Sequence, residues 1–425
     1  MRILIVAFYY PPEDSWAQVA SLRPHSWAKY WSQMGHRVYV LTTHRPESNP
    51  ESTNPAIIGV RYWPARPTQP VLAKDPGDRP QPAPSLKGKM LAQLRDTRQR
   101  LGLGSFLQSS DGWLAPACRE ALRLHRAVDL DMVISTYGPP ANHSIAARLK
   151  QQTGLFWVAD YRDLWHGNPY VPINAALGRL EDWRERRCVA QADLVTTVSE
   201  GLATTLSARL NKPVVTVENG FDLDDLSDIQ LHLWGDRKRR LLYTGTLYPG
   251  KQTPEPLFAA LAQLRADNAA IAESLEVLFY GWNLVSLTAH IKTYQLESLV
   301  KVCDPRPRRE ILALQRSVDA LIFLDWQDPA VDGILTGKLY EYMFAGRPIL
   351  GIGATPTTAA GRMLIELGIG QTLGNDPAAI AAAIAPLLSG QPLPYSPRTD
   401  QMQRYTRQAL AQRLLREAIA AMHSG

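Results

Sequence analysis

Short apolar runs alternate with helix-length amphipathic segments along almost the whole chain. That alternation is typical of parallel β-sheets covered by helices on both faces. In the first half, strands are predicted at ILIVAFYY, RVYVLTT, DMVIST, LFWVAD, DLVTTVS and VVTVENG. In the second half, strands are predicted at RRLLYTGT, LEVLFYG, LVKVCD, DALIFLD and RPILGIG. The pattern predicts an α/β protein with two doubly wound, Rossmann-like domains that face each other across a cleft.

A polar stretch without strand signals separates the two halves at residues 225–236. We therefore expect an N-terminal domain over residues 1–225 and a C-terminal domain over residues 236–399. Residues 400–425 carry a helical amphipathic pattern and predict one further helix, for which ordinary packing is the simplest role. With 425 residues, of which 45% are hydrophobic, the chain is long enough to build two cores.

Residues 46–105 interrupt this alternation. Their first part is rich in proline and predicts a long irregular excursion. Residues 86–101 then combine an apolar stripe with basic side chains, which favours contact with an anionic membrane surface. Packing of the stripe on the first domain, with the basic residues in solvent, explains the same pattern. The stripe consists of Leu86, Met90, Leu94 and Leu101, and the basic residues are Lys87, Lys89, Arg95, Arg98 and Arg100.

The formal charge of +6 suits an anionic partner such as a phosphorylated substrate or an acidic membrane. Zinc-ligand spacing and the aromatic and basic signature of RNA binding are both missing, so we expect no nucleic-acid partner. Three widely spaced cysteines argue against a disulfide framework and for a reducing compartment. The opening MRILIVAFYYPPED lacks a signal-peptide cleavage site, and no apolar run is long enough to span a bilayer. We expect a cytoplasmic protein that can rest on the inner face of the cell membrane.

The segment TGKLYEYMFAGRPIL places a candidate anion site at a helix start. Unpaired N–H groups at Thr336 and Gly337, together with the ammonium of Lys338, favour a phosphate there. Glu341, one helical turn later, suits a ligand that carries hydroxyl groups next to its phosphate, as the ribose of a nucleotide does. The alternative is a solvent-exposed ion pair between Lys338 and Glu341.

A second candidate anion site lies in the turn GTLYPGK, which follows the strand RRLLYTGT. Gly245 and Gly250 let the backbone approach a ligand closely, and Lys251 supplies a mobile cation for a diphosphate. The spacing is not that of a P-loop, and an ordinary turn between strand and helix explains it as well. Because both turns follow strands of one predicted sheet, we expect them at the same sheet edge.

In the first half, FWVADYRDLW ends a predicted strand with three charged residues. Asp160, Arg162 and Asp163 are either catalytic groups that face a polar ligand or an internal ion pair that closes a loop. Trp165 is a candidate platform for the face of a sugar. His143, at a predicted helix start, is best interpreted as a capping or surface residue.

Seven segments in order resemble the retaining GT-B glycosyltransferases that build bacterial surface polysaccharides such as capsule, exopolysaccharide and O-antigen. They are FYYPP, SLRPHSWAKYWSQMGHRVYVLTT, WVADYRDLW, ADLVTTVSEGL, VENGFDL, YTGTLYPGK and TGKLYEYMFAGRPIL. The resemblance covers most of residues 1–45 and 113–353. It implies a nucleotide-diphosphate sugar as donor, expected to be a UDP-sugar, held mainly by the second domain. A lipid-linked or saccharide acceptor would be held by the first domain, and the resemblance implies no metal or other cofactor.

The family's functional residues can be carried over only where this sequence matches. Lys251 resembles the lysine that binds the diphosphate, and Glu341 resembles the second glutamate of the family's E-x-x-x-x-x-x-x-E motif, which binds the ribose. The expected donor-binding residues are Gly245, Thr246, Lys251, Thr336, Gly337, Lys338 and Glu341. The expected catalytic residues are Asp160, Arg162 and Asp163, and the expected acceptor-binding residues are Ser15, Trp16 and Trp165.

The sequence departs from the family at several of these positions. The first glutamate of the motif falls at Gly333, and Thr246 stands where an arginine is usual. DSWAQ, with Ser15 and Trp16, replaces a glycine pair, and the family's active-site histidine would fall near Arg162. Two alternatives therefore remain open, a sugar-nucleotide 2-epimerase on the same fold and a catalytically idle GT-B partner subunit.

Overall fold

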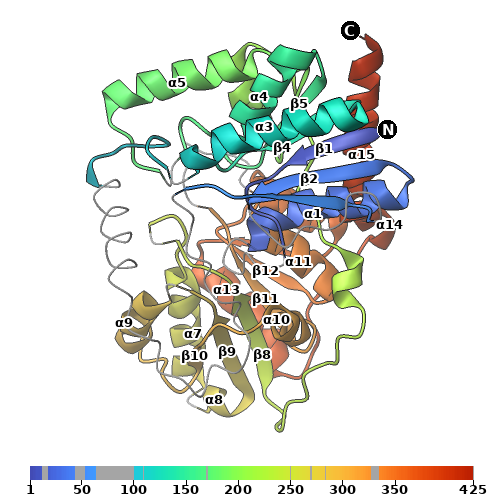
Figure 1. The fold of residues 1–425 in the computed structure, drawn as a ribbon. Coiled ribbons are helices and arrows are strands. Elements are labelled where there is room, and N and C mark those ends of the chain that lie inside the picture. The colour runs from blue at the N-terminus through green and yellow to red at the C-terminus, as the bar shows by residue number, and fades with distance from the viewer. Residues whose placement is uncertain are drawn as a thin grey trace. The chain divides into compact units, whose positions relative to one another are not determined.

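The computed structural model describes residues 1–11, 18–43, 53–63, 100–108, 110–168, 171–248, 250–268, 270–282, 284–326 and 335–424. The chain divides into two compact units (Figure 1). The first combines Met1–Glu218 with Leu410–Gly425, and the second is Asn219–Ala409.

The first unit is built on a seven-stranded parallel sheet with the strand order β3-β2-β1-β4-β5-β6-β7. Its strands are β1 (Arg2–Val6), β2 (Arg37–Thr43), β3 (Ala56–Val60), β4 (Met132–Thr136), β5 (Phe156–Tyr161), β6 (Leu194–Thr197) and β7 (Val214–Thr216). Its helices are α1 (Gln18–Gln33), α3 (Asp111–Val128), α4 (Ala141–Thr153), α5 (Ala175–Val189), α6 (Glu200–Leu210) and α15 (Arg407–Ser424). The order reverses between β1 and β4, which is the switch point of a doubly wound sheet.

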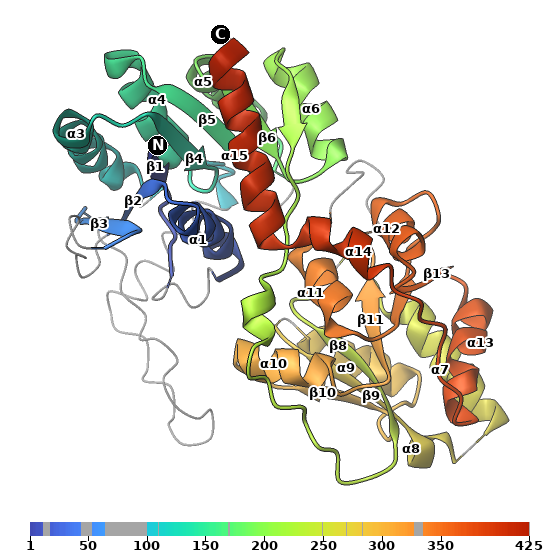
Figure 2. The same cartoon turned by 90° about the vertical axis from the view of Figure 1, so that its right-hand side faces the viewer.

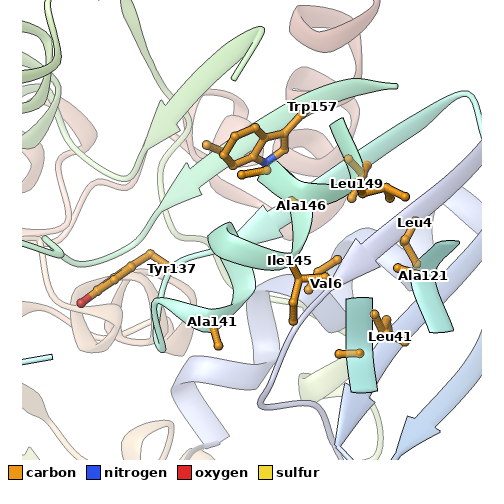
Figure 3. Packing of buried hydrophobic residues seen from close by; sticks show 14 of the residues in the cluster. Leu4, Val6, Leu41, Ala121, Tyr137, Ala141, Ile145, Ala146, Leu149 and Trp157 are labelled. Atoms are coloured by element: carbon orange, nitrogen blue, oxygen red, sulfur yellow. The ribbon is translucent and has the colours of Figure 1, made fainter. Parts of the chain in front are cut away.

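The strands of this sheet are apolar because both faces are covered. On one face, Leu4 and Val6 of β1 pack in a cluster with Ile145 and Leu149 of α4 (Figure 3). Alternate residues of β1 pack on the other face in a cluster that includes Leu414 of α15. Helix α15, the red helix that ends at the C-terminal mark in Figure 2, thus completes the core of the first unit.

The second unit contains a six-stranded parallel sheet with the order β10-β9-β8-β11-β12-β13. Its strands are β8 (Arg239–Thr244), β9 (Leu275–Tyr280), β10 (Val300–Cys303), β11 (Ala320–Leu324), β12 (Ile349–Ile352) and β13 (Gly370–Gly374). Its α-helices are α7 (Glu255–Asp267), α8 (Ile271–Ser274), α9 (Val285–Thr293), α10 (Arg308–Gln315), α11 (Gly337–Ala345), α12 (Ala359–Leu367), α13 (Pro377–Leu388) and α14 (Thr399–Met402), and the 3-10 helices are η1 (Leu223–Leu226) and η2 (Gln403–Tyr405).

The predicted α/β architecture with two Rossmann-like sheets is confirmed, and each run predicted as a strand contains one. Two strands were missed. β13 has a weak apolar pattern, and β3 lies inside the excursion that was predicted to be irregular. β3 forms because AIIGV pairs in parallel with β2 and buries alternate side chains.

The structure corrects the position of the boundary between the two halves. The division falls between Glu218 and Asn219, and the predicted linker 225–236 belongs to the second unit. The reason is packing: the indole of Trp234 donates a hydrogen bond of 2.7 Å to the carbonyl of Ser317 and lies against the guanidinium of Arg240.

The C-terminal segment also differs from the single helix predicted over residues 400–425. It contains α14 and the adjoining η2, which Thr406 separates from α15; Thr406 has an extended backbone and pairs with Phe221. Only the last part joins the first unit, where the carbonyl of Ala411 accepts a hydrogen bond of 2.8 Å from the indole of Trp31. No helix in the described part of the chain is long and apolar enough to cross a membrane.

Candidate active site

The donor-binding residues predicted in the second unit gather at the carboxyl ends of β8 and β11. These strands are neighbours, and the strand order reverses between them. At such a switch point the loops from adjacent strands turn to opposite faces of the sheet and leave room for a ligand. Gly245, in the turn after β8, and Lys338, at the start of α11, meet there.

Gly245 begins the turn that follows β8. Its backbone has a φ of 115°, which a residue with a β-carbon adopts only with strain, and its N–H donates a hydrogen bond of 2.8 Å to the carbonyl of Tyr280. Gly281 packs against the same turn, because a β-carbon placed there would lie 2.0 Å from the carbonyl oxygen of Gly245. The two glycines bring the ends of β8 and β9 into backbone contact.

Lys338 points into the Gly245 turn. A β-carbon built on Gly245 would lie 3.3 Å from Nζ of Lys338, and this nitrogen also lies 3.7 Å from the ring centroid of Tyr243. The residue as a whole is partly buried. Burial lowers the pKa of Lys338 to about 7, and nearby Glu341 opposes that effect. An anion in the turn would supply the missing counter-charge.

Helix α11 begins without a capping side chain. Thr336 stands at the N-cap position with extended backbone, but its side chain makes no capping hydrogen bond. The buried hydroxyl oxygen of Thr336 has no hydrogen-bond partner among the described residues. The first N–H groups of α11 and this hydroxyl are the donors that a phosphate group would use.

Glu341 forms an ion pair with Arg308 of α10, and no ion pair joins it to Lys338 among the described residues. The guanidinium of Arg308 also donates a hydrogen bond of 2.9 Å to the carboxylate of Asp225. The alternative considered from the sequence, an exposed ion pair between Lys338 and Glu341, is therefore wrong, because Glu341 pairs with Arg308 instead. Arg308 holds the Glu341 carboxylate in place one turn beyond the helix start.

Three further residues near this edge differ in exposure. Thr246 is partly buried, and its carbonyl oxygen accepts a hydrogen bond of 2.9 Å from the hydroxyl of Tyr243. Lys251 is also partly buried, and its backbone N–H donates to the carbonyl of Tyr248. Trp282 follows β9 and is 61% exposed, so its ring face is accessible at the edge that Gly245 occupies.

The residues predicted as catalytic in the first unit have separate environments. Asp160 is fully buried and paired with Arg23 of α1 at 2.7 Å. Its carboxylate also accepts hydrogen bonds of 3.1 and 2.9 Å from the hydroxyls of Thr136 and Thr196. The internal ion pair considered from the sequence exists between Arg162 and Asp163, at 3.8 Å, whereas the cation that pairs with Asp160 is Arg23. With every partner supplied by the protein, Asp160 fastens α1 to the sheet and is not available to a ligand.

Arg162 is mostly buried and holds the turn after β4. It donates hydrogen bonds to the carbonyls of Tyr137 and Gly138, at 2.8 and 3.3 Å. Asp163 lies 3.8 Å from Arg162, and its side chain is 53% exposed. Of the three charged residues, only Asp163 presents its carboxylate to solvent.

Trp165 is 3% exposed, which argues against its predicted role as a sugar platform. Its ring stacks on Tyr137 at 6.0 Å, and its indole donates a hydrogen bond to the hydroxyl of Ser105. His143 is also fully buried, and not on the surface as expected; it contacts Ser135 at 2.8 Å, and burial lowers its pKa to about 3. Both residues belong to the core at the carboxyl ends of β4 and β5.

Some predictions fall outside the described residues. These are the acceptor-binding Ser15 and Trp16, the substituted motif position Gly333, and most of the basic segment, residues 86–99.

Sequence reasoning missed the residues that support the site from other elements. Tyr342 of α11 accepts a hydrogen bond of 2.8 Å from the backbone N–H of Thr244, and Gln315 of α10 donates one of 2.9 Å to the Thr244 hydroxyl. Arg308 and Trp282 were missed too. The sequence offered a signal only for Trp282, a large aromatic residue directly after a predicted strand.

Comparison with solved structures identifies the class of fold. Sucrose-phosphate synthase from Thermosynechococcus elongatus superimposes with a TM-score of 0.60 at 13% identity, over 100% of both chains. The lipopolysaccharide outer core galactosyltransferase WaaB, in its apo form, gives 0.53 at 13% identity, over 99% of this chain and 100% of its own. A putative UDP-N-acetylglucosamine 2-epimerase from Listeria monocytogenes gives 0.52 at 11%, over 100% and 97%. The fold, with its two Rossmann-like sheets, is that of the GT-B glycosyltransferases.

The sequence itself supports this class in its first half. Residues 21–220 match the family model of the glycosyl transferase 4-like domain. The similarity to this domain thus lies almost entirely within the first unit. A search of curated proteins found no match.

Proposed function

We propose that this chain is a glycosyltransferase that moves a sugar from a nucleotide-diphosphate sugar, a UDP-sugar, to a lipid-linked or saccharide acceptor in bacterial cell-surface polysaccharide synthesis. The observation that carries the proposal is the ammonium of Lys338, which lies against the Gly245 turn beside the uncapped start of α11. The match of residues 21–220 to a glycosyl transferase 4-like domain supports the same activity. WaaB, a galactosyltransferase of the lipopolysaccharide outer core, supports the cell-surface role by analogy of fold only.

The site suits a reaction in which a diphosphate leaves. Negative charge that develops on the leaving group would be stabilised by Lys338, by Lys251 and by the N–H groups at the start of α11. Because these groups supply the positive charge, we expect activity without a bound metal. Glu341, held by Arg308, would accept hydrogen bonds from the ribose hydroxyls. Retention of the anomeric configuration is the stereochemistry that the resemblance implies.

A second candidate is a sugar-nucleotide 2-epimerase, which the similarity in fold to the Listeria monocytogenes protein favours. A catalytically idle partner subunit is the non-enzymatic alternative. Incubation with a panel of sugar nucleotides separates the three: transfer or slow hydrolysis supports a transferase, C2 isomerisation supports an epimerase, and no turnover with any donor supports an idle subunit.

The donor site itself is tested by comparing UDP with inorganic pyrophosphate in calorimetric titrations. Lys251→Ala should weaken both ligands about ten- to a hundredfold, because a charge-assisted contact contributes about 1.5 to 3 kcal/mol. Glu341→Ala should weaken UDP by a similar factor but leave pyrophosphate unchanged, since pyrophosphate has no ribose.

Glu255→Ala, at the exposed start of α7, is the matched control and should bind both ligands as the wild type does. Unchanged UDP affinity in both the Lys251 and the Glu341 variants would remove the proposed donor site. Equal loss of UDP and pyrophosphate affinity in Glu341→Ala would remove the ribose assignment.

A further inference from the structure

Helix α5 of the first unit has an exposed face with an unusual composition. Figure 1 shows α5 along the outside of the unit, beyond α4. With 3.6 residues per turn, Trp183 lies at the centre of the exposed face, with Leu180 and arginines on both sides. Trp183 is 56% exposed and Leu180 is 44% exposed, although large apolar side chains are usually buried. The arginines of this face are Arg179, Arg184, Arg186 and Arg187, all exposed.

The acidic and basic side chains of α5 lie on different faces of the helix. Glu181 and Glu185 point to the buried side, and Asp182, at the margin, pairs with Arg186 at 2.8 Å. The exposed positions of this helix therefore carry four cations and no carboxylate. Such a face attracts anions, and it does so around an exposed tryptophan.

The segment 101–107 extends the same surface. It is tied to the start of α5 by backbone hydrogen bonds of 2.8 Å, from the N–H of Asn174 to the carbonyl of Gly102, and of 3.1 Å, from the N–H of Gly104 to the carbonyl of Pro172. The guanidinium of Arg184 lies 4.8 Å from the ring centroid of Phe106. These contacts fix the segment beside the helix.

Two more large apolar side chains are exposed on this segment. Leu101 is 59% exposed and Leu107 is 78% exposed. Leu107 also has a φ of 54°, a left-handed backbone conformation that is costly for a bulky residue. We use "the α5 surface" for Leu101, Leu107, Leu180, Trp183 and the four arginines.

We propose that the α5 surface docks on a bilayer that contains anionic phospholipids. The headgroup layer accepts both kinds of side chain at once, since aromatic rings lie at the boundary between headgroups and acyl chains while guanidinium groups bind lipid phosphates. Leucines on either side of Trp183 add apolar area that water would otherwise cover. This proposal does not depend on the proposed glycosyltransferase activity, because binding to vesicles needs neither a sugar donor nor an acceptor.

A second copy of the chain fits this surface less well. A twofold interface would place this arginine-rich surface opposite the same surface of the second copy, and like charges across an interface are strongly unfavourable. A bilayer with anionic lipids offers charge complementarity over the whole surface. An acidic protein partner is separated from the bilayer by the experiment below, which contains no protein other than this chain.

The test is co-sedimentation of the full chain with vesicles of phosphatidylcholine alone or mixed with phosphatidylglycerol. The wild type should bind the mixed vesicles and not the neutral ones, and binding should fall steeply between 0.1 and 1 M salt. Arg179→Glu/Arg187→Glu should lower the partition coefficient about tenfold or more, because each basic residue contributes about one charge to the attraction. Trp183→Ala should lower it about tenfold through lost apolar contact.

Matched controls separate this surface from the net charge of the protein. Arg119→Glu/Arg126→Glu makes the same charge change on exposed positions of α3 and should bind nearly as the wild type does. Leu233→Ala removes a side chain that is 90% exposed in the second unit and should have no effect. Circular dichroism confirms that each variant is folded.

The proposal is overturned if the wild type does not bind anionic vesicles. It is likewise overturned if Arg119→Glu/Arg126→Glu lowers binding as much as Arg179→Glu/Arg187→Glu does. It is also overturned if wild type and α5 variants bind equally. Sedimentation velocity without lipid adds one more outcome: a dimer that Trp183→Ala dissociates would assign the surface to self-association instead.

Discussion

At the residue scale, the surroundings of Lys338 suit the binding of an anion. Its ammonium contacts an aromatic ring and a glycine turn, and burial lowers its pKa to about 7. A lysine in bulk solvent titrates near 10.4. Lys338 therefore gains or loses its charge within the physiological pH range, and a bound anion would favour the charged form.

Lys338 predicts a pH dependence of UDP binding. The diphosphate favours the charged ammonium, so the pKa of Lys338 should be higher in the complex than about 7, its value in the free protein. Above pH 7, binding must therefore take up a proton, and affinity should fall by up to about tenfold per pH unit until the pKa of the complex is reached. Below about pH 7 the lysine is already charged, and its contribution to the pH dependence should disappear.

Calorimetry in pairs of buffers with different ionisation enthalpies measures this proton directly. At pH 8.5 the wild type should take up close to one proton per UDP, whereas Lys338→Met should take up none and bind UDP more weakly. If the wild type bound UDP at pH 8.5 without proton uptake, either the pKa assignment or the placement of the diphosphate beside Lys338 would be incorrect.

At the scale of elements, the proposed donor site depends on how closely two strand ends approach each other. The ends of β8 and β9 touch through Gly245 and Gly281, with no room for a side chain between them. Tyr342 and Gln315 then fix the end of β8 through Thr244. The turn is thus held from three elements, which is how a rigid scaffold positions a binding loop.

Gly281→Ala is expected to displace the Gly245 turn. Its β-carbon would lie 2.0 Å from the carbonyl oxygen of Gly245, and a backbone atom cannot rotate away as a flexible side chain can. We expect UDP affinity to fall at least tenfold in a calorimetric titration, together with a loss of thermal stability. Gly235→Ala is the control, because the space around Gly235 is open; equal behaviour of the two variants would show that the close approach is unimportant for binding.

At the scale of the whole molecule, the chain leaves the first unit, builds the second and returns. Residues 410–425 complete the first unit, and the ion pair between Arg413 and Glu218, at 3.0 Å, joins the returning segment to the last residue of the first passage. The stability of the first unit therefore depends on the C-terminal end of the chain as much as on its beginning.

Leu414→Ala should destabilise the first unit selectively. Leu414 is fully buried between α15 and the sheet, and truncation of a buried leucine costs about 2 to 5 kcal/mol. In calorimetric melting, UDP should raise the transition of the second unit, while Leu414→Ala should lower the other transition. Arg416→Ala, exposed on the same helix, should leave both unchanged; a loss confined to the UDP-sensitive transition would contradict the placement of α15.

Most strands and the sheet edge of the candidate site can be predicted from the sequence, because they depend on local patterns of apolar residues and turns. Apolar runs predicted most strands of both sheets, since a strand covered on both faces must be apolar whatever its neighbours are, but β3 and β13 were missed. Gly245 and Lys338 could be placed at one edge because parallel strands end on the same side of a sheet. Their roles as donor-binding residues remain a prediction.

The tertiary structure decided which charges meet, because ion pairs join residues that are distant in sequence. Arg23 and Asp160 are 137 positions apart, and Arg308 and Glu341 are 33 apart, so no local pattern could pair them. The same holds for burial: Trp165 and His143 carry polar atoms and looked accessible, yet the packing of neighbouring strands encloses both. The sequence alone determined the elements and the sheet edge where a site could form, whereas only the fold determined which side chains are left there to meet a ligand.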